Sequence, residues 1–317
     1  MADLVVTLPE PEFVEAVGER PGVRLEVWDL QGRPEAVERA EVVVPPYQYG
    51  EDRFPALAEV PRLRMVQTLT AGYDSLLPHL PEGVALANAF GVHDASTSEL
   101  AVALALAALR GLPDYVRDAE HGRWRPQQRR ALADRRVLVV GYGGVGQGVA
   151  ARLAPFETSV TAVASRPRKT GPDGVPVHGV DELPKLLPQH DVVVLATPLN
   201  DATRGLVDAA FLAAMPDGAL LVNVARGAVV DTPALLAELQ SGRLQAALDV
   251  TDPEPLPADH PLWSAPGALI SPHVGGATSA FFPRAVRMLR AQLDRLSTGA
   301  PLRGIVVPND WSRQREE

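Results

Sequence analysis

Arg226, Glu254 and His273 each lie just past a short apolar run of the kind that forms a buried strand. An arginine can bind a carboxylate with its fixed fork of donors, and a histidine can donate a proton near neutral pH. A carboxylate beside the histidine would favour its protonated form. The three side chains could therefore hold a 2-oxo acid and protonate its ketone oxygen as a hydride arrives. Taken singly, each has an ordinary alternative: a surface arginine, a loop acid between two prolines, and a helix-capping histidine.

A hydride carrier is predicted by the stretch 135–154, RRVLVVGYGGVGQGVAARLA. Val137–Val140 is typical of a buried parallel strand, and Val145, Val149 and Leu153 recur with the spacing of one helix face. Between them lies a G-x-G-x-x-G, in which glycines let strand, helix and a bound pyrophosphate approach closely. The N–H groups and the dipole at the helix start favour the phosphates. The residues expected to contact a dinucleotide here are Gly141, Gly143, Gly144, Val145 and Gly146. The alternative is a merely structural glycine-rich turn.

The segment 163–169, VASRPRK, bears on which dinucleotide is bound. An Asp or Glu about 20 residues past the glycines selects NAD, because it accepts a hydrogen bond from the ribose 2′-hydroxyl. Here that region holds a hydroxyl and three cations and no carboxylate. Ser165 and Arg166 would suit a 2′-phosphate, so the sequence predicts NADP(H), with NAD(H) possible. The alternative is that Arg166 is a solvated loop cation or stacks on adenine.

The second half of the sequence alternates strand and helix patterns. Six apolar runs are predicted to be buried strands: 137–140, 160–163, 192–196, 220–224, 246–250 and 268–271. This repetition is typical of the doubly wound α/β (Rossmann) dinucleotide-binding domain, whose ligands lie at the carboxyl ends of the strands. Residues 1–90 carry five further strand candidates, separated by helical pieces such as 11–17 and 35–39: 4–8, 25–30, 42–44, 65–69 and 84–87. They predict a second, smaller α/β domain.

A long apolar helix is predicted to lie either between the two domains or between subunits. Ser96 and Glu99 match a capping box, so we expect the helix to begin at Ser96 and to run to Arg110. The apolar run after the box predicts burial on all sides. Its continuation, 115–124, ends in a tryptophan flanked by arginines and is either an interface arm or a surface loop.

The stretch 281–296 also has helical periodicity and is expected to pack back on the first domain, ahead of the short apolar run 305–307. We therefore predict a discontinuous first domain, 1–95 with 283–317, and a dinucleotide-binding domain, 96–282; the role of the first as a substrate domain is what the family resemblance described below implies.

The composition of the 317 residues narrows the classes of function. A net charge of −9 argues against nucleic acid as a partner, because phosphate backbones are bound by clustered Lys and Arg. The absence of cysteine excludes zinc–thiolate sites and thiol nucleophiles. The longest apolar run, 100–109, is about half of a membrane span, and residues 1–10 lack a signal-peptide core, so we expect a cytoplasmic protein that binds no membrane. No metal site is expected, since the remaining histidines lack ligand spacing and are assigned to the surface or to turns: His79, His93, His121, His178, His190 and His260.

The loop 70–74, TAGYD, follows the fourth strand candidate of the first domain. Gly72 would free backbone N–H groups for an anion there. The residues alone favour the alternative, an ordinary strand-to-helix turn.

The chain resembles the D-isomer-specific 2-hydroxyacid dehydrogenases in a series of motifs that cover nearly its whole length. The motifs, in chain order, are LTAGYD, NAFGVHDASTSELA, GYGGVGQG, LATPLNDATRGLVD, NVARGAVVD, ALDVTDPEPLP and SPHVGG. The resemblance implies that Arg226 orients the substrate, that His273 is the acid/base, and that Glu254 is its carboxylate partner. It also implies that Asp249 contacts the nicotinamide amide and that Thr197 and Pro198 line the cofactor cleft. The N–H groups of Ala71 and Gly72 would contact the substrate carboxylate.

The same resemblance implies a flavodoxin-like substrate domain, a homodimer built through the cofactor domain, and domain closure on substrate. Ser165 and Arg166 are similar to the NADPH-preferring glyoxylate/hydroxypyruvate reductases of the family. The predicted function is thus reversible hydride transfer from NADPH to a small 2-oxo acid, giving a D-2-hydroxy acid. Two alternatives remain: an NAD-dependent dehydrogenase of a larger or phosphorylated substrate such as phosphoglycerate, and a non-catalytic dinucleotide-sensing interaction protein.

Overall fold

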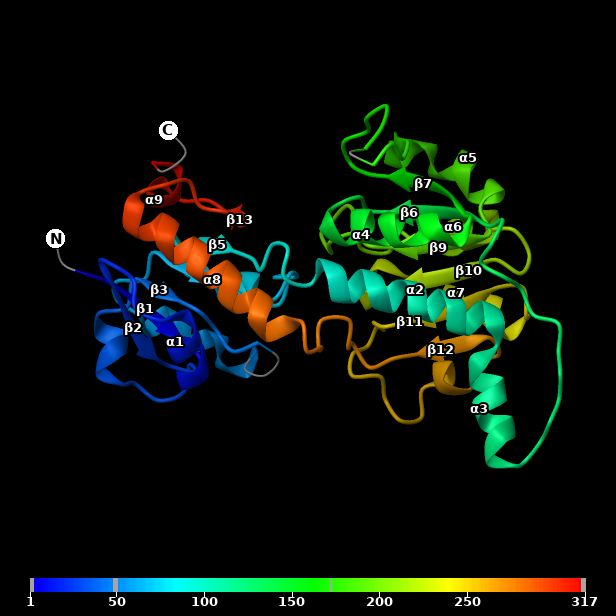
Figure 1. Cartoon of the computed structure of the whole chain (residues 1–317), viewed down its shortest axis with the longest axis horizontal. Helices are drawn as coiled ribbons and strands as arrows, with labels where there is room; N and C mark the ends of the chain where they lie inside the picture. Colours follow the sequence, from blue (N-terminus) through cyan, green and yellow to red (C-terminus); the bar gives the residue numbers. More distant parts are fainter. Residues whose placement is uncertain (1–2, 48–50, 172, 315–317) are drawn as a thin grey trace. The chain divides into compact units, whose positions relative to one another are not determined.

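The computed structural model describes residues 3–47, 51–171 and 173–314, and the chain divides into two units. Unit 1 combines 1–93 with 279–317, and unit 2 is 94–278 (Figure 1). These boundaries lie two and four residues from the predicted ones. The assignment of substrate and cofactor to the two units stays a prediction.

Unit 2 is built on a seven-stranded parallel sheet with the strand order β12-β11-β10-β9-β6-β7-β8. Its strands are β6 (Arg136–Val140), β7 (Ser159–Val163), β8 (Val177–His178), β9 (Val192–Leu195), β10 (Leu220–Asn223), β11 (Gln245–Leu248) and β12 (Ala268–Ile270). The chain starts in the middle at β6, builds outward through β7 and β8, and then returns to add β9 on the other side. This order confirms the doubly wound fold and puts its switch point between β6 and β9.

Helices cover both faces of this sheet, because the side chains of β6 point alternately to either side. The helices of unit 2 are α2 (Asp94–Arg110), α3 (Leu112–Glu120), α4 (Gly144–Leu153), α5 (Leu183–Leu186), α6 (Ala209–Ala214) and α7 (Thr232–Gln240). Val137 and Val139 join one core with α2 and α4, whereas Leu138 and Val140 join the other with α6 and α7. Short 3-10 turns lie at Ala154–Phe156, Val180–Glu182, Leu187–Gln189, Gly227–Val229 and Pro261–Ser264.

The predicted start and surroundings of α2 were wrong in two respects. The helix begins at Asp94, whose negative charge suits a helix N-terminus, and Ser96 is buried inside the first turn instead of capping it. The prediction that this helix is buried on all sides is also wrong, since Ala103 is exposed. The predicted continuation is a separate helix: α3 starts after Gly111, ends at Glu120 and so leaves Trp124 in irregular chain.

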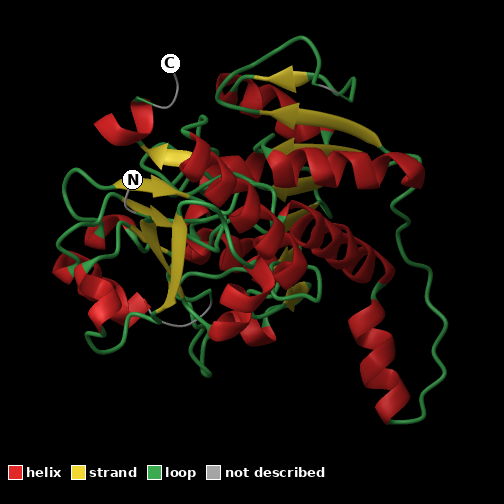
Figure 2. Cartoon of the chain, turned by 60° about the vertical axis from the view of Figure 1, so that its left-hand side comes forward, coloured by secondary structure: helices red, strands yellow, loops and turns green. Residues whose placement is uncertain are grey.

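Within the described residues, no single helix has the length and apolar character of a membrane span. Only α2 and α3 taken together pass on length and composition, and they meet at an angle of 66°. Figure 2 shows α3 and the long loop after it standing away from the sheet of unit 2.

Unit 1 contains a six-stranded sheet with the order β13-β5-β4-β3-β1-β2, parallel except for β13. Its strands are β1 (Leu4–Leu8), β2 (Val23–Val27), β3 (Val42–Val43), β4 (Met65–Gln67), β5 (Ala85–Ala87) and β13 (Ile305–Val307). The order of β2, β1, β3, β4 and β5 is that of flavodoxin-like sheets. The helices are α1 (Pro11–Val17), α8 (Phe281–Thr298) and α9 (Asp310–Arg313), with 3-10 turns at Glu35–Glu38, Glu51–Glu59 and Leu77–His79.

The last long helix confirms that the chain returns to its first unit. Leu289 and Leu293 of α8 pack in one core with Val6 and Leu8 of β1. The second strand begins two residues earlier than predicted and ends at Val27. The edge strand β8 was not predicted at all, because it has only two residues in a proline-rich, polar stretch.

Candidate active site

The glycine-rich turn joins β6 to α4 and is formed by close backbone contacts. Gly141 has φ 97°, and a Cβ there would lie 2.5 Å from the carbonyl of Ala196. A Cβ on Gly146 would lie 2.0 Å from the carbonyl oxygen of Gly141. Only glycines allow β6, α4 and the segment after β9 to meet this closely.

The same turn has one open side, at the start of α4. A Cβ on Gly143 would meet no protein atom within 4 Å, and no side chain caps the helix. The N–H groups of Gly144, Val145 and Gly146 are therefore the uncapped donors of a helix N-terminus, where the dipole favours negative charge. These residues fit the diphosphate of a dinucleotide.

Ser165 and Arg166 follow β7 and are exposed. Two residues further along the chain, the guanidinium of Arg168 lies 5.6 Å from the ring centre of Tyr142, whose hydroxyl donates to the Asp173 carboxylate at 2.7 Å. Burial, and next the bond to Asp173, raise the pKa of Tyr142, so the hydroxyl keeps its proton. Tyr142 thus links the glycine turn to the segment beyond β7, a link that the sequence reasoning missed.

Thr197 and Pro198 follow β9, on the far side of the switch point from β7. A Cβ on Gly141 would lie 2.7 Å from the backbone nitrogen of Thr197, so this segment borders the glycine turn directly. The hydroxyl of Thr203 donates to the carbonyl of Pro198 at 2.7 Å and holds the segment in place. The predicted lining residues therefore adjoin the turn.

Arg226 lies three residues past the end of β10 and is half-buried. A buried amide, Asn223, shapes this turn: its Oδ1 accepts from the N–H of Ala225 and its Nδ2 donates to the carbonyl of Arg226, both at 3.0 Å. The guanidinium of Arg226 donates to the Ala225 carbonyl at 2.8 Å. Asn223 is a second positioning residue that sequence reasoning did not identify.

Asp249 follows β11, is buried, and holds the loop that carries His273. Its carboxylate accepts from the Ser271 hydroxyl at 2.6 Å and from the N–H groups of Val274 and Gly275 at 2.9 and 2.8 Å. Its backbone carbonyl accepts from the N–H of His273 at 2.8 Å. Asp249 thus organises this loop; its predicted contact with a nicotinamide stays a prediction.

His273 and Glu254 form the central pair of the site. Nδ1 of His273 lies 2.5 Å from Oε1 of Glu254, and the side chains are 44% and 39% exposed. An ionised carboxylate only accepts hydrogen bonds, so the contact suits the tautomer with its proton on Nδ1, which leaves Nε2 for another partner. The backbone of His273 has φ 51°, the left-handed region that non-glycine residues rarely adopt.

The loop that carries Glu254 is also fixed, and it adjoins Arg226. The hydroxyls of Thr232 and Thr251 donate to the carbonyls of Asp252 and Pro253, each at 2.9 Å. A Cβ on Gly227 would lie 1.8 Å from the Thr251 carbonyl oxygen, so the residue after Arg226 packs against this loop. Because β10, β11 and β12 are neighbours, the structure brings the predicted arginine, carboxylate and histidine to one edge of the sheet.

Ala71 and Gly72 belong to unit 1, where they follow β4. Their carbonyls accept from Asn88 Nδ2 at 2.8 Å and from the Thr70 hydroxyl at 2.7 Å. Their N–H groups make no hydrogen bond within the described part of the chain. The loop therefore presents N–H groups while its carbonyls are occupied, the arrangement that an anion needs.

Two of the remaining histidines correct the prediction of surface or turn positions. His93 is buried: its Nε2 lies 2.8 Å from the carbonyl of Leu69, and its ring stacks on Tyr47 and Phe281. His190 is buried beside the carbonyl of Leu186, and burial lowers its pKa. In the described residues, no group of three or more His, Asp or Glu side chains is placed to hold a metal ion.

Comparison with known proteins gives the context of this geometry. Residues 102–275 match the family model "D-isomer specific 2-hydroxyacid dehydrogenase, NAD binding domain". A human glyoxylate reductase/hydroxypyruvate reductase is 34% identical over 68% of this chain and 68% of its own length. Glyoxylate/hydroxypyruvate reductase A of Klebsiella pneumoniae strain 342 is 32% identical, covering 90% of this chain and 91% of its own. The crystal structure of a D-isomer specific 2-hydroxyacid dehydrogenase from Xanthobacter autotrophicus Py2, in complex with NADPH and MES, matches with TM-score 0.81 at 29% identity, over 99% of this chain and 100% of that one.

Proposed function

Because the chain belongs to the D-isomer-specific 2-hydroxyacid dehydrogenase family, we propose that it reduces a small 2-oxo acid, of the glyoxylate or hydroxypyruvate type, with NADPH. The family defines the enzyme class, a dehydrogenase acting on the CH–OH group of D-2-hydroxy acids. The observation that carries the proposal is the contact of His273 Nδ1 with Glu254 Oε1 at the strand edge beside Arg226.

The roles of these side chains follow from their chemistry. A bound nicotinamide dinucleotide would supply the hydride. Arg226 holds the substrate carboxylate and polarises the ketone, since its planar fork matches a carboxylate. His273 donates the proton to the ketone oxygen from Nε2, while Glu254 fixes the orientation of the ring through Nδ1. Asp249 positions His273 through the loop between Ser271 and Gly275.

Two further parts of the chain are proposed to bind the reactants. The N–H groups of Ala71 and Gly72 would bind a substrate carboxylate. Ser165 and Arg166 would bind the 2′-phosphate of NADPH, supported by their exposure and by the lack of a carboxylate between 163 and 169. The relative from Xanthobacter autotrophicus binds NADPH.

The decisive experiment follows absorbance loss of NADPH and of NADH separately, with glyoxylate, hydroxypyruvate, pyruvate and a bulkier 2-oxo acid. We expect fast oxidation of NADPH with the two small acids. Preference for NADH would contradict the reading of Ser165 and Arg166 but leave the reaction class intact. No turnover with any pair would contradict the proposed substrates. An Arg166→Ala variant, which should raise KM for NADPH and leave that for NADH unchanged, separates the two questions.

We also propose a homodimer formed through the arm of unit 2, defined as α3 and residues 121–131. Val116 is 62% and Trp124 is 94% exposed, which leaves apolar surface uncovered. The arm has fixed internal contacts: Arg125 donates to the buried Asp118 at 2.9 Å and thereby lowers its pKa. Sedimentation should show a dimer that Val116→Glu dissociates, whereas Trp263→Ala, elsewhere on unit 2, should not. The expected cytoplasmic location stays a prediction for cell fractionation.

A further inference from the structure

Unit 1 contains a hollow of about 270 Å³ whose lining gathers cations. The arginines that line it are Arg284, Arg287, Arg295 and Arg303. The rest of the lining comes from the segment Asn88–Val92 and from one face of α8, and among the described residues it includes no aspartate or glutamate. Like charges placed together repel, so such a lining is favourable mainly when an anion occupies it.

The helix periodicity of α8 explains why three of these arginines share a face. Arg284, Arg287 and Arg295 are separated by three and eight residues, which is a stripe along one side of an α-helix. The opposite side carries Leu289 and Leu293, which are buried in the core of the unit. The core packing of α8 therefore fixes the direction in which the arginine stripe faces.

The fourth arginine comes from a backbone segment that is held by a buried amide. Gln292, which is 4% exposed, donates from Nε2 to the carbonyl of Arg303 at 2.8 Å and accepts at Oε1 from its N–H at 3.1 Å. The same Nε2 lies 3.0 Å from Oε1 of the buried Gln67 on β4. The backbone under Arg303 is thus fixed relative to α8 and to the sheet.

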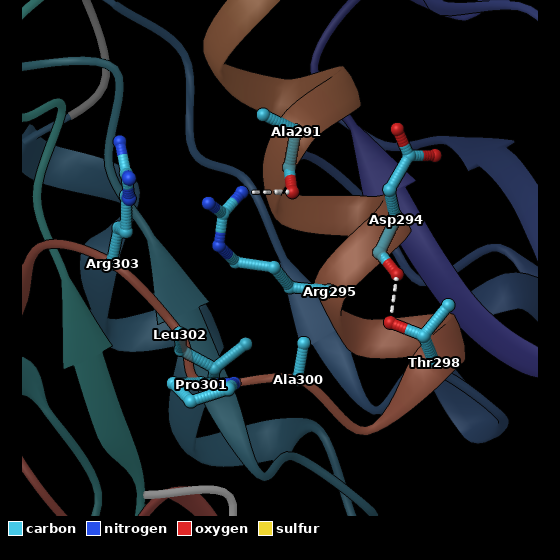
Figure 3. A pocket seen from close by; sticks show the side chains of 8 residues that line it. All are labelled: Ala291, Asp294, Arg295, Thr298, Ala300, Pro301, Leu302 and Arg303. Atoms are coloured by element: carbon cyan, nitrogen blue, oxygen red, sulfur yellow. Dashed lines mark hydrogen bonds between the residues drawn. The ribbon is translucent and has the colours of Figure 1, made fainter.

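The existing contacts leave most of this positive charge uncompensated. The side chains of Arg284, Arg287 and Arg303 make no hydrogen bond or ion pair with the part of the chain that the structure describes, and the guanidinium of Arg295 donates to the carbonyl of Ala291 at 2.8 Å. Figure 3 shows the adjoining hollow, with Arg295 projecting from α8 on one side and Arg303 on the other.

An acidic side chain borders only that second hollow. It is Asp294, which pairs with Arg20 at 3.1 Å and points away from Arg295 in Figure 3. The first hollow therefore has no carboxylate of its own lining to neutralise it.

We propose that this arginine hollow binds a compact small-molecule anion that carries two or more negative charges on carboxylate or phosphate groups. Guanidinium groups bind both kinds of oxyanion through paired hydrogen bonds. The volume lies just below the range of pockets for drug-sized ligands, which favours a small anion. All of the residues that line the hollow belong to unit 1, whereas Arg226 and His273 belong to unit 2. The inference therefore does not depend on the identity of the reduced 2-oxo acid.

Calorimetric titration of the full chain at low ionic strength, with inorganic pyrophosphate and with citrate, tests the proposal when NADP⁺ or NAD⁺ is saturating, so that the cofactor and not the probe occupies the glycine-rich turn of unit 2. We expect saturable binding of one anion per chain to the wild type, weakened by added salt. Arg287→Ala and Arg303→Ala replace exposed side chains and should each weaken binding about tenfold or more, as the loss of a charge-assisted hydrogen bond predicts. The matched control is Arg62→Ala, an exposed arginine of unit 1 outside the hollow, which should change nothing.

A second control separates this hollow from the candidate active site. In Arg226→Ala the anion should bind as it does to the wild type. Loss of binding in Arg226→Ala together with unchanged binding in Arg287→Ala would show that the probe occupies the active site, and the proposal would be wrong. Absence of saturable binding of both probes to the wild type would also overturn it. Because the readout is heat of binding, failure of the proposed reductase activity would not affect the result.

Discussion

His273 carries three constraints at once. Its backbone is left-handed, its N–H is bonded to Asp249, and its Nδ1 faces Glu254. Residues held in sparsely populated backbone regions cost free energy and persist where the surroundings fix them, which is frequent at functional sites. Here the surroundings are the buried carboxylate of Asp249 and the loop it organises. The ring is therefore oriented before any substrate binds.

Replacing His273 tests the proton donor. His273→Ala should lower kcat about 10²–10⁴-fold, the usual contribution of a general acid, with the dissociation constant for NADPH unchanged. Glu254→Gln should lower kcat less, because the amide oxygen can still accept a hydrogen bond from Nδ1 and keep the ring oriented. Steady-state kinetics and cofactor titration measure both quantities. Turnover of His273→Ala at the wild-type rate would refute the role of the histidine.

Replacing Arg226 tests substrate orientation. Arg226→Ala should lower kcat/KM roughly 10²–10³-fold, the scale of losing a donor to a developing charge. Arg226→Lys keeps the positive charge but loses the planar fork, so it should recover only part of the loss. Kinetics with glyoxylate, with NADPH saturating, distinguish the two variants. Equal activity of the lysine variant and the wild type would show that charge alone suffices.

At the scale of elements, the glycine-rich turn between β6 and α4 contains one glycine that packs against the protein and another that is open to a ligand. Gly146 is required because α4 lies directly on the strand, whereas Gly143 faces open space. The two glycines are three residues apart, yet only Gly146 is constrained by packing against protein atoms. The arm of unit 2 likewise combines a structural and an exposed part. The buried Asp118 accepts a hydrogen bond from Arg125, while Val116 and Trp124 are exposed.

This difference predicts opposite behaviour for two similar variants. Gly146→Ala puts a Cβ 2.0 Å from the carbonyl oxygen of Gly141, so it should destabilise the fold by about 1–3 kcal/mol, a typical cost of overpacking. Gly143→Ala meets no protein atom and should leave the melting temperature unchanged, yet it should weaken NADPH binding. Thermal unfolding and cofactor titration of both variants check this. Similar melting temperatures for the two would contradict it.

At the scale of the whole molecule, acid should destabilise the fold through His190. Burial lowers the pKa of His190 below its ordinary value of 6.5, so the folded form stays neutral where the unfolded chain is protonated. Above pH 6.5 both states are neutral and His190 adds no pH dependence. As pH falls below 6.5, the unfolded state alone takes up the proton, and the free energy of unfolding decreases.

A pH series of thermal unfolding between pH 7.5 and roughly 5 tests this through His190→Gln, which removes the titrating group. The melting temperature of the variant should fall less steeply with acid than that of the wild type. His79→Gln, a substitution at an exposed histidine of unit 1, is the control and should keep the wild-type slope. Equal slopes for all three proteins would contradict the role of His190.

Most of the architecture could be predicted because it follows from local patterns. Apolar β-branched runs predicted the central strands. The glycine-rich turn with its flanking strand and helix predicted the edge of the sheet at which a dinucleotide would bind. Contacts between distant residues could not be read in this way. Nothing local indicates that Asn223 shapes the Arg226 turn, that Asp249 holds the His273 loop, or that Gln292 reaches Gln67. The start of α2 was misplaced because a capping-box pattern can also occur inside a first turn.

The strand β13 pairs with β5, and α8 packs on β1, so unit 1 is assembled from segments at opposite ends of the sequence. A ribosome synthesises 279–317 after all of 94–278. The continuous unit can therefore acquire its complete sheet while the nascent chain is still being extended, whereas the divided unit waits for its last helix and edge strand. Until then, one edge of β5 has no partner. During synthesis, the residues of β1 to β5 are thus made before unit 2 but reach their complete native surroundings only after it.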